Sequence, residues 1–101
     1  MMVVTELMNG GLLTPMLEDR RGIYSEEFCK YTLYRVVQSL IDLHSRNIVH
    51  RDIKSDNVYC SLDGDIKLSG FEFATILTQE EPTLDEKVGS VCWMAPEIII
   101  G

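Results

Sequence analysis

The most regular pattern of hydrophobic and polar positions lies between residues 25 and 45. Hydrophobic side chains recur there at steps of three and four, which places them on one face of an α-helix. This stripe consists of Phe28, Thr32, Val36, Leu40 and Leu43, widened by Tyr34, Val37, Ile41 and His44. Ser25 is a favourable N-cap, and Glu26 and Glu27 suit the positive end of the helix dipole. The pattern predicts an amphipathic helix from about Ser25 to about Ser45, buried along one side and ended by Asn47 in a left-handed conformation.

After the polar block at 50–57, hydrophobic residues occur at every second position, and this alternation predicts a β-hairpin. Hydrophobic residues alternate on both sides of a turn at Asp63-Gly64. They are Val58, Cys60 and Leu62 before the turn, and Ile66 and Leu68 after it. The 69–96 stretch has little periodicity and predicts a long loop of the kind that is usually functional or mobile.

The first residues of the chain are apolar, and Met1 to Val4 predict a buried strand that Asn9-Gly10-Gly11 interrupts. Leu12 to Leu17 predict a short helix with Pro15 in its first turn, closed by Arg20-Arg21-Gly22. The far end is also apolar, at Ile98-Ile99-Ile100. Because neither end resembles a polar, frayed terminus, we expect the chain to be a piece of a larger domain.

Composition narrows the possible functions. The chain has 101 residues and a formal net charge of -7, which suits one small domain and argues against binding to nucleic acid or anionic membranes. Three cysteines, Cys29, Cys60 and Cys92, are widely spaced. We therefore predict buried or half-buried free thiols in a reducing compartment rather than a disulfide framework or zinc site. No signal-peptide pattern occurs, and no apolar run approaches the roughly 20 residues of a membrane span, so we expect a cytoplasmic or nuclear protein.

The block from His50 to Asn57 carries the candidate chemistry. Phosphoryl transfer needs a carboxylate to accept the hydroxyl proton, a cation on the phosphates and oxygen ligands for magnesium. Asp52, Lys54 and Asn57 can supply these three in turn. Any one of these residues alone is better explained by a solvated polar loop. The pattern His-Arg-Asp-x-Lys-x-x-Asn, however, sets five identities in eight positions.

This block resembles the catalytic loop of the protein kinase family. Its Lys-Ser-Asp-Asn ending resembles the PAK-like branch of the sterile-twenty group of serine/threonine kinases. Residues 3–11 resemble the last N-lobe strand, gatekeeper and hinge, and residues 89–97 resemble the substrate-receiving loop that ends in Ala-Pro-Glu. The resemblance implies an α+β fold over residues 1–101. This would be a partial kinase domain with hinge, C-lobe helices, catalytic-loop hairpin and activation segment, lacking the N-lobe and late C-lobe.

The resemblance also implies roles for individual residues, together with ATP, Mg²⁺ and a protein substrate in the complete domain. Asp52 matches the catalytic base, Lys54 the phosphate-contacting lysine and Asn57 a magnesium ligand. The residues matching the nucleotide-binding edge are Thr5 (gatekeeper), Glu6 and Met8 (backbone contacts to adenine). Regulatory and structural matches are His50 and Phe71 (hydrophobic spine), Arg51 (phosphorylated-loop binding), Ser90 (support for Asp52 and Lys54) and Glu97 (the Ala-Pro-Glu glutamate).

Several positions depart from the family pattern. Gly70-Phe71-Glu72 stands where Asp-Phe-Gly is expected, and Gly70 cannot chelate magnesium, which should cost orders of magnitude in rate. Glu72 is interpreted as a surface carboxylate, with a substitute metal ligand as the alternative. Glu86 stands at the expected phosphothreonine. It is either a phosphate mimic toward Arg51 or, with Asp85, a solvated acidic turn. Tyr59 is expected to crowd the adenine.

Three hypotheses follow. The first is a fragment of a PAK-like serine/threonine kinase that transfers the γ-phosphoryl of ATP to a protein hydroxyl when complete. We expect no useful catalysis from this chain, because Gly70 replaces the metal-binding Asp and no Gly-rich loop or strand lysine precedes the hinge. The second is a pseudokinase that acts as a scaffold or allosteric partner of other proteins. The third is a partial gene product without a function of its own.

Overall fold

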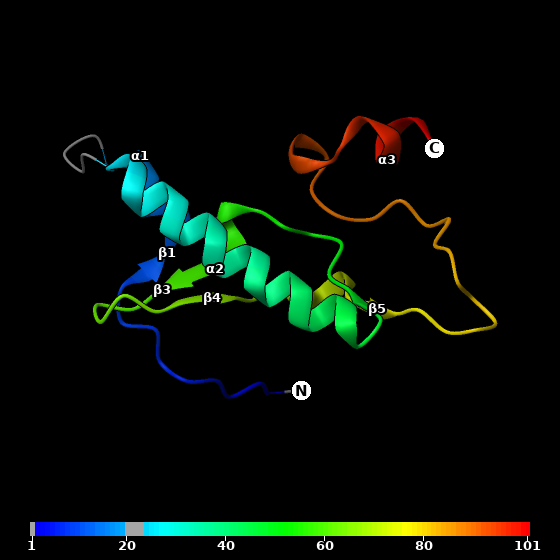
Figure 1. Ribbon diagram of the computed structural model, residues 1–101, viewed down its shortest axis with the longest axis horizontal. Coiled ribbons are helices and arrows are strands. Elements are labelled where there is room, and N and C mark those ends of the chain that lie inside the picture. Colours follow the sequence, from blue (N-terminus) through cyan, green and yellow to red (C-terminus); the bar gives the residue numbers. More distant parts are fainter. Residues whose placement is uncertain (1, 20–23) are drawn as a thin grey trace.

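One long helix and two small antiparallel sheets organise the part of the chain that the structure describes (Figure 1). The structure is a computed structural model that describes residues 2–19 and 24–101. The helices and strands are β1 (Gly11–Leu12), α1 (Leu13–Glu18), α2 (Glu26–Ser45), β2 (Ile48–Val49), β3 (Val58–Cys60), β4 (Ile66–Leu68), β5 (Thr75–Ile76) and α3 (Pro96–Ile100). Three short 3₁₀ turns, η1, η2 and η3, cover Ser55–Asn57, Phe71–Phe73 and Val91–Trp93. This mixture of elements confirms the predicted α+β class.

Helix α2 begins and ends where the sequence predicted. The Ser25 hydroxyl accepts the backbone N–H of Phe28 at 3.1 Å, which satisfies one of the free N–H groups of the first turn. At the other end Asn47 has φ 58, and its N–H donates to the carbonyl of His44 at 3.0 Å. A left-handed Asn just after the last turn is a common helix ending because its short side chain tolerates positive φ.

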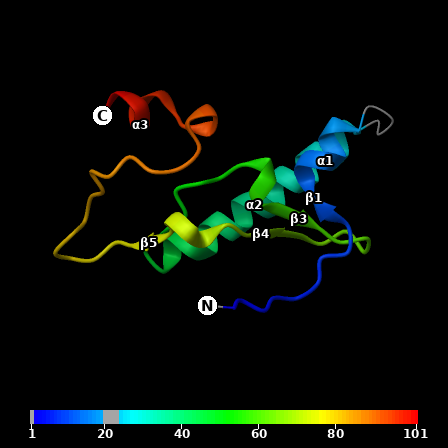
Figure 2. The same ribbon diagram turned by 180° about the vertical axis from the view of Figure 1, so that it is seen from behind.

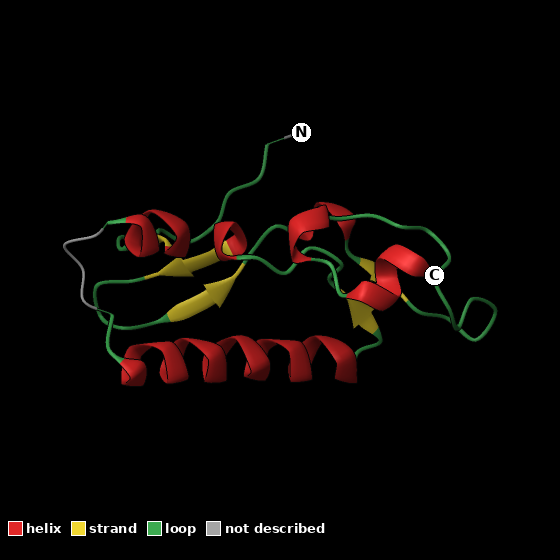
Figure 3. Cartoon of the chain, turned by 90° about the horizontal axis from the view of Figure 1, so that it is seen from above, coloured by secondary structure: helices red, strands yellow, loops and turns green. Residues whose placement is uncertain are grey.

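The buried stripe of α2 is narrower than predicted. Thr32 is buried, and the rest of the predicted stripe is half-buried, namely Phe28, Val36, Leu40 and Leu43. The residues expected to widen it are exposed instead: Tyr34, Val37, Ile41 and His44. Strands β2 and β4 pack against α2, and the sheets lie on one side of this helix (Figure 3). The spacing of hydrophobic residues therefore indicated an apolar face on α2 that the other described residues only partly cover.

The predicted hairpin is present and supplies most of the core. Strands β3 and β4 pair antiparallel, with Cys60 opposite Ile66, and β1 adds to the outer edge of β3. Gly64 takes φ 93 in the turn, which suits a residue without a Cβ. Leu62 was predicted to extend the first strand, but it lies exposed in the turn because pairing stops at Cys60. The core consists of Leu13, Val58, Cys60 and Ile66, with Met16, Phe28, Val36 and Leu68 packed against it.

The amino-terminal prediction was wrong in part. Residues Met2 to Val4 form no strand and are exposed, because no described strand lies beside them to pair with. The first strand is β1, after the turn at Asn9-Gly10. Helix α1 confirms the predicted short helix, starting one residue later and with Pro15 in its first turn. Met1 and the expected helix end at Arg20-Arg21-Gly22 lie outside the described residues.

The 69–96 stretch is mostly irregular, as predicted, and makes a wide arc away from α2 that is visible from both sides (Figures 1 and 2). It contains one strand that the sequence did not indicate. Strand β5 pairs with β2 through Ile76 and Thr75, and two residues are too few to show a period. No helix in ranges 2–19 and 24–101 combines the length and apolar character needed to cross a membrane.

The three cysteines are free. The prediction of buried or half-buried thiols holds for Cys60, which lies in the core, where burial raises the pKa of its thiol. Cys29 and Cys92 are exposed instead, because the described residues leave these faces of α2 and η3 open.

Candidate functional site

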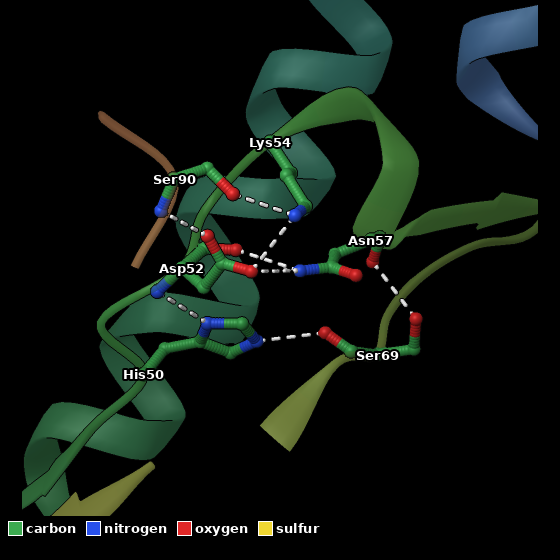
Figure 4. A network of polar contacts seen from close by, with 6 residues as sticks. All are labelled: His50, Asp52, Lys54, Asn57, Ser69 and Ser90. Carbon is green, nitrogen blue, oxygen red and sulfur yellow. Dashed lines mark hydrogen bonds and ion pairs between the residues drawn. The ribbon is translucent and has the colours of Figure 1, made fainter. Parts of the chain in front are cut away.

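A cluster of polar side chains forms where the 50–57 loop leaves β2 and turns through η1 into β3 (Figure 4). The flanking elements hold the loop on both sides, which lets several short polar side chains converge. Two further segments reach the cluster, from the end of β4 and from just before η3. Its members are His50, Asp52, Lys54, Asn57, Ser69 and Ser90.

Asp52 lies at the centre of this cluster and is buried, with 6% of its surface exposed. Its Oδ1 accepts the backbone N–H of Ser90 at 2.8 Å, and its Oδ2 lies 3.0 Å from the ammonium of Lys54. Burial raises the pKa of this carboxyl, but hydrogen bonds from Ser90 and Lys54 outweigh burial and lower the pKa to about 2. The carboxylate is therefore ionised at neutral pH.

Lys54 connects Asp52 to a distant part of the chain. Its Nζ donates to Ser90 Oγ at 2.6 Å as well as pairing with Asp52, although Lys54 and Ser90 are 36 residues apart. The arrangement predicted for Asp52, Lys54 and Ser90 is thus present as geometry.

The Asn57 amide nitrogen points toward Asp52. Its Nδ2 donates to the backbone carbonyl of Asp52 at 2.8 Å and to Asp52 Oδ2 at 3.1 Å. Gly70 lies on the other side of the same amide, with φ 77. A Cβ added to Gly70 would lie 2.2 Å from Asn57 Cγ and 2.3 Å from Asn57 Oδ1. The Asn57 side chain therefore occupies the space that a side chain at position 70 would need.

These residues do not fit a magnesium ion. Mg²⁺ requires a near-octahedral set of oxygen ligands, usually with one or two carboxylates from the protein. Ranges 2–19 and 24–101 hold no group of three or more His, Cys, Asp or Glu residues able to bind a metal. Gly70 offers no side-chain oxygen, and the Asn57 amide, whose Nδ2 is bonded to Asp52, has only its Oδ1 to offer as a ligand. The cluster satisfies its carboxylate with protein donors instead.

His50 supports the loop from inside the fold and is 1% exposed. Its Nδ1 accepts the backbone N–H of Asp52 at 3.2 Å, and its Nε2 donates to the carbonyl of Ser69 at 2.7 Å. The ring centroids of His50 and Phe71 lie 4.8 Å apart, so the two predicted spine residues are in contact. The sequence did not single out Ser69, whose contact with His50 is made by its backbone carbonyl.

Arg51 joins the loop to two distant segments. Its Nη1 lies 3.1 Å from Glu86 Oε2, and its Nε donates to the carbonyl of Phe73 at 2.6 Å. Glu86 itself remains largely exposed. The ion pair that a phosphate mimic would need is present. Because Glu86 is exposed, a pair of this kind contributes about 0–1 kcal/mol to stability.

The residues predicted to bind a nucleotide line a pocket of about 560 Å³, a size typical of small-molecule sites. Thr5, Glu6 and Met8 form one side of it, and Tyr59 is on its wall. Asn57, Gly70 and Glu72 also line it. Lys54 is not part of this lining, because its ammonium faces Asp52 and Ser90. Lys67, which no sequence pattern singled out, also lines the pocket and pairs with Glu6 at 2.5 Å.

Glu97 lies apart from this cluster, exposed in the first turn of α3. The structure thus brings together Asp52, Lys54, Asn57 and Ser90, and it leaves the Ala-Pro-Glu glutamate outside this cluster.

Residues 1–101 match the family model described as "Protein kinase domain". The chain is 41% identical over 100 residues to "Serine/threonine-protein kinase pakA" of Dictyostelium discoideum, covering 98% of this chain and 8% of that protein. It is 40% identical over 97 residues to "Serine/threonine-protein kinase PAK 4" of Mus musculus, covering 96% of this chain and 16% of the relative. It is also 40% identical over 97 residues to "Serine/threonine-protein kinase ste20" of Emericella nidulans, covering 96% and 11% respectively. The chain therefore spans a small part of the curated relatives it matches.

Proposed function

Because the chain belongs to the protein kinase family, with PAK-like serine/threonine kinases among its relatives, we propose that it is a kinase-domain segment whose phosphoryl-transfer site is disabled at the metal. It then acts as a non-catalytic module toward other proteins. Kinases of this family use ATP and Mg²⁺ to phosphorylate protein hydroxyl groups. The proposal concerns which parts of that chemistry this chain retains.

The chain retains the residues that would position the hydroxyl group that receives the phosphoryl group. In phosphoryl transfer a carboxylate positions the attacking hydroxyl and a cation balances phosphate charge. Asp52 is ionised, with a pKa of about 2, and Lys54 is held beside it by Ser90. These contacts support the assignment of Asp52 as the former base and Lys54 as the former phosphate contact.

The missing part is the metal, and one observation carries the proposal: the Asn57 amide fills the space beside Gly70 and bonds to Asp52. Metal ions bridge the phosphates and neutralise the charge that develops during transfer. Without a carboxylate at position 70, the ligands that the described residues offer beside Asn57 lack the usual carboxylate for a magnesium ion. We expect the rate of phosphoryl transfer to fall by orders of magnitude.

A second candidate function is weak kinase activity with Glu72 as the substitute ligand. Glu72 lines the same pocket as Asn57 and Gly70, which favours this alternative. Against it, Glu72 is exposed and lies in η2, two residues beyond Gly70.

The test is transfer of radiolabelled γ-phosphate from ATP to a generic serine/threonine acceptor protein, using the full chain with Mg²⁺. Asp52→Asn and Glu72→Gln are the comparison variants. We expect the wild type to match Asp52→Asn, with no turnover above background. Wild-type turnover that disappears in Asp52→Asn would overturn the non-catalytic proposal. If that turnover also disappears in Glu72→Gln, Glu72 would be established as the ligand.

Thermal melting with ATP gives a second measure. If the pocket binds nucleotide without a metal site, ATP should raise the melting temperature equally with and without Mg²⁺. A stabilisation that requires Mg²⁺ would contradict the proposal.

A further inference from the structure

Gly89 lies directly against the backbone of the 50–57 loop. A Cβ added to Gly89 would lie 2.3 Å from the carbonyl oxygen of Arg51 and 3.6 Å from Asp52 Oδ1. Backbone atoms cannot yield as a flexible side chain does, so any residue other than glycine would push the two segments apart. Gly89 also has φ 112, a conformation that residues with a Cβ rarely adopt.

The residue after Gly89 makes the contacts that hold the 77–90 segment on the loop. The Ser90 N–H donates to Asp52 Oδ1 at 2.8 Å, and Ser90 Oγ accepts from Lys54 at 2.6 Å. Both bonds require the backbone at position 90 to approach the loop closely. A shift of 1 Å would lengthen both beyond hydrogen-bonding distance.

Arg51 contributes the other half of this contact. It is one of two described non-glycine residues with positive φ, at 68°, a strained conformation that needs support from its surroundings. That support comes from the bonds of its guanidinium to Phe73 and Glu86. Two left-handed residues, Arg51 and Gly89, thus meet backbone to backbone beside Asp52.

We propose that Gly89 is a positioning residue: its lack of a side chain allows the 77–90 segment to dock against the Arg51 carbonyl, and this docking delivers Ser90 to Asp52 and Lys54. The docking is set by backbone shape and therefore requires neither metal nor phosphorylation. It is independent of whether the chain transfers phosphate.

Gly64 offers a matched control. It has a similar positive φ of 93, but a Cβ added there would meet no atom within 4 Å. Gly64→Ala therefore carries the backbone strain without the collision, whereas Gly89→Ala carries both.

The experiment follows the Ser90 amide by NMR in the full chain. An N–H bonded to a buried carboxylate resonates downfield and exchanges slowly with solvent. We expect Gly89→Ala to lower the protection of the Ser90 amide at least tenfold and to move its resonance upfield, while the β3 and β4 amides keep their shifts. Gly64→Ala should leave Ser90 within twofold of wild type.

Two results would overturn the proposal. One is a Ser90 amide that keeps its shift and protection in Gly89→Ala, and the other is an equal loss in Gly64→Ala. If Gly89→Ala does not fold, the wild type still tests whether the 77–90 segment is docked, which the proposal requires. A Ser90 amide that exchanges as fast as that of exposed Glu80 would rule out the docked segment, and strong protection would support it.

Discussion

The amide of Asn57 lies 2.2–2.4 Å from the point where a Cβ of residue 70 would be placed, and only glycine at that position permits this arrangement. From this position the Asn57 Nδ2 donates hydrogen bonds to the backbone carbonyl and the Oδ2 of Asp52. Gly70 thus has two effects on the site. It offers no side-chain ligand to a metal, and it leaves room for the Asn57 amide beside Asp52.

Gly70→Asp by itself is expected not to create a magnesium site. The new side chain collides with Asn57 and must also adopt φ 77, so we expect a loss of about 1–3 kcal/mol in the free energy of unfolding. Urea unfolding measures this loss, and titration with Mn²⁺ followed by electron paramagnetic resonance measures the metal. Gly11→Asp is the control, since Gly11 has φ 81 and open space around it. Tight Mn²⁺ binding to the Gly70→Asp chain would show that Asn57 moves aside easily.

The stability of the chain should depend on pH through Asp52. Its pKa is about 2 in the folded chain against 3.8 ordinarily, so its contribution is present above pH 4 and is lost as pH falls toward 2. We expect this contribution to reach at most about 2 kcal/mol. Urea unfolding of wild type and Asp52→Asn across this pH window tests it. The gap between the two should narrow on acidification, and a constant gap would contradict the assignment.

Removing Lys54 should be costly because it leaves Asp52 buried without its cation. We expect Lys54→Met to destabilise the chain by about 2–4 kcal/mol, and Asp52→Asn in the same chain to recover part of that loss. Lys30→Met is the matched control. Lys30 pairs with Glu26 at 2.7 Å, but both side chains are largely exposed, so its removal should cost under about 0.5 kcal/mol. Similar losses for the two lysines would mean that burial does not strengthen the Asp52 pair.

The pair between Arg51 and Glu86 should be weak and sensitive to salt. Glu86→Gln is expected to cost about 0.2–1 kcal/mol at low ionic strength and almost nothing at high ionic strength, because Glu86 is exposed. Arg51 keeps its bond to the Phe73 carbonyl in this variant. Denaturant unfolding at two salt concentrations checks this expectation. A large loss that salt does not reduce would indicate that Glu86 holds the segment much as a phosphate would.

Local pattern alone was sufficient for several elements. The cap at Ser25, the three- and four-residue steps and the left-handed Asn47 depend on neighbours within a few residues, and α2 has the predicted bounds. The hairpin around Gly64 is equally local. The grouping of Asp52, Lys54 and Asn57 was also readable, because eight consecutive residues carry it.

Tertiary structure decided the rest, since those contacts join residues far apart in the chain. Ser90 reaches Asp52 across 38 residues, and this approach depends on backbone shape at Gly89, which no local pattern reports. The exposure of Tyr34 and Ile41 depends on which elements pack against α2. The sequence by itself determined the family and the presence of a glycine at position 70. Only the fold showed that Asn57 fills the space left there, because that outcome depends on packing in three dimensions.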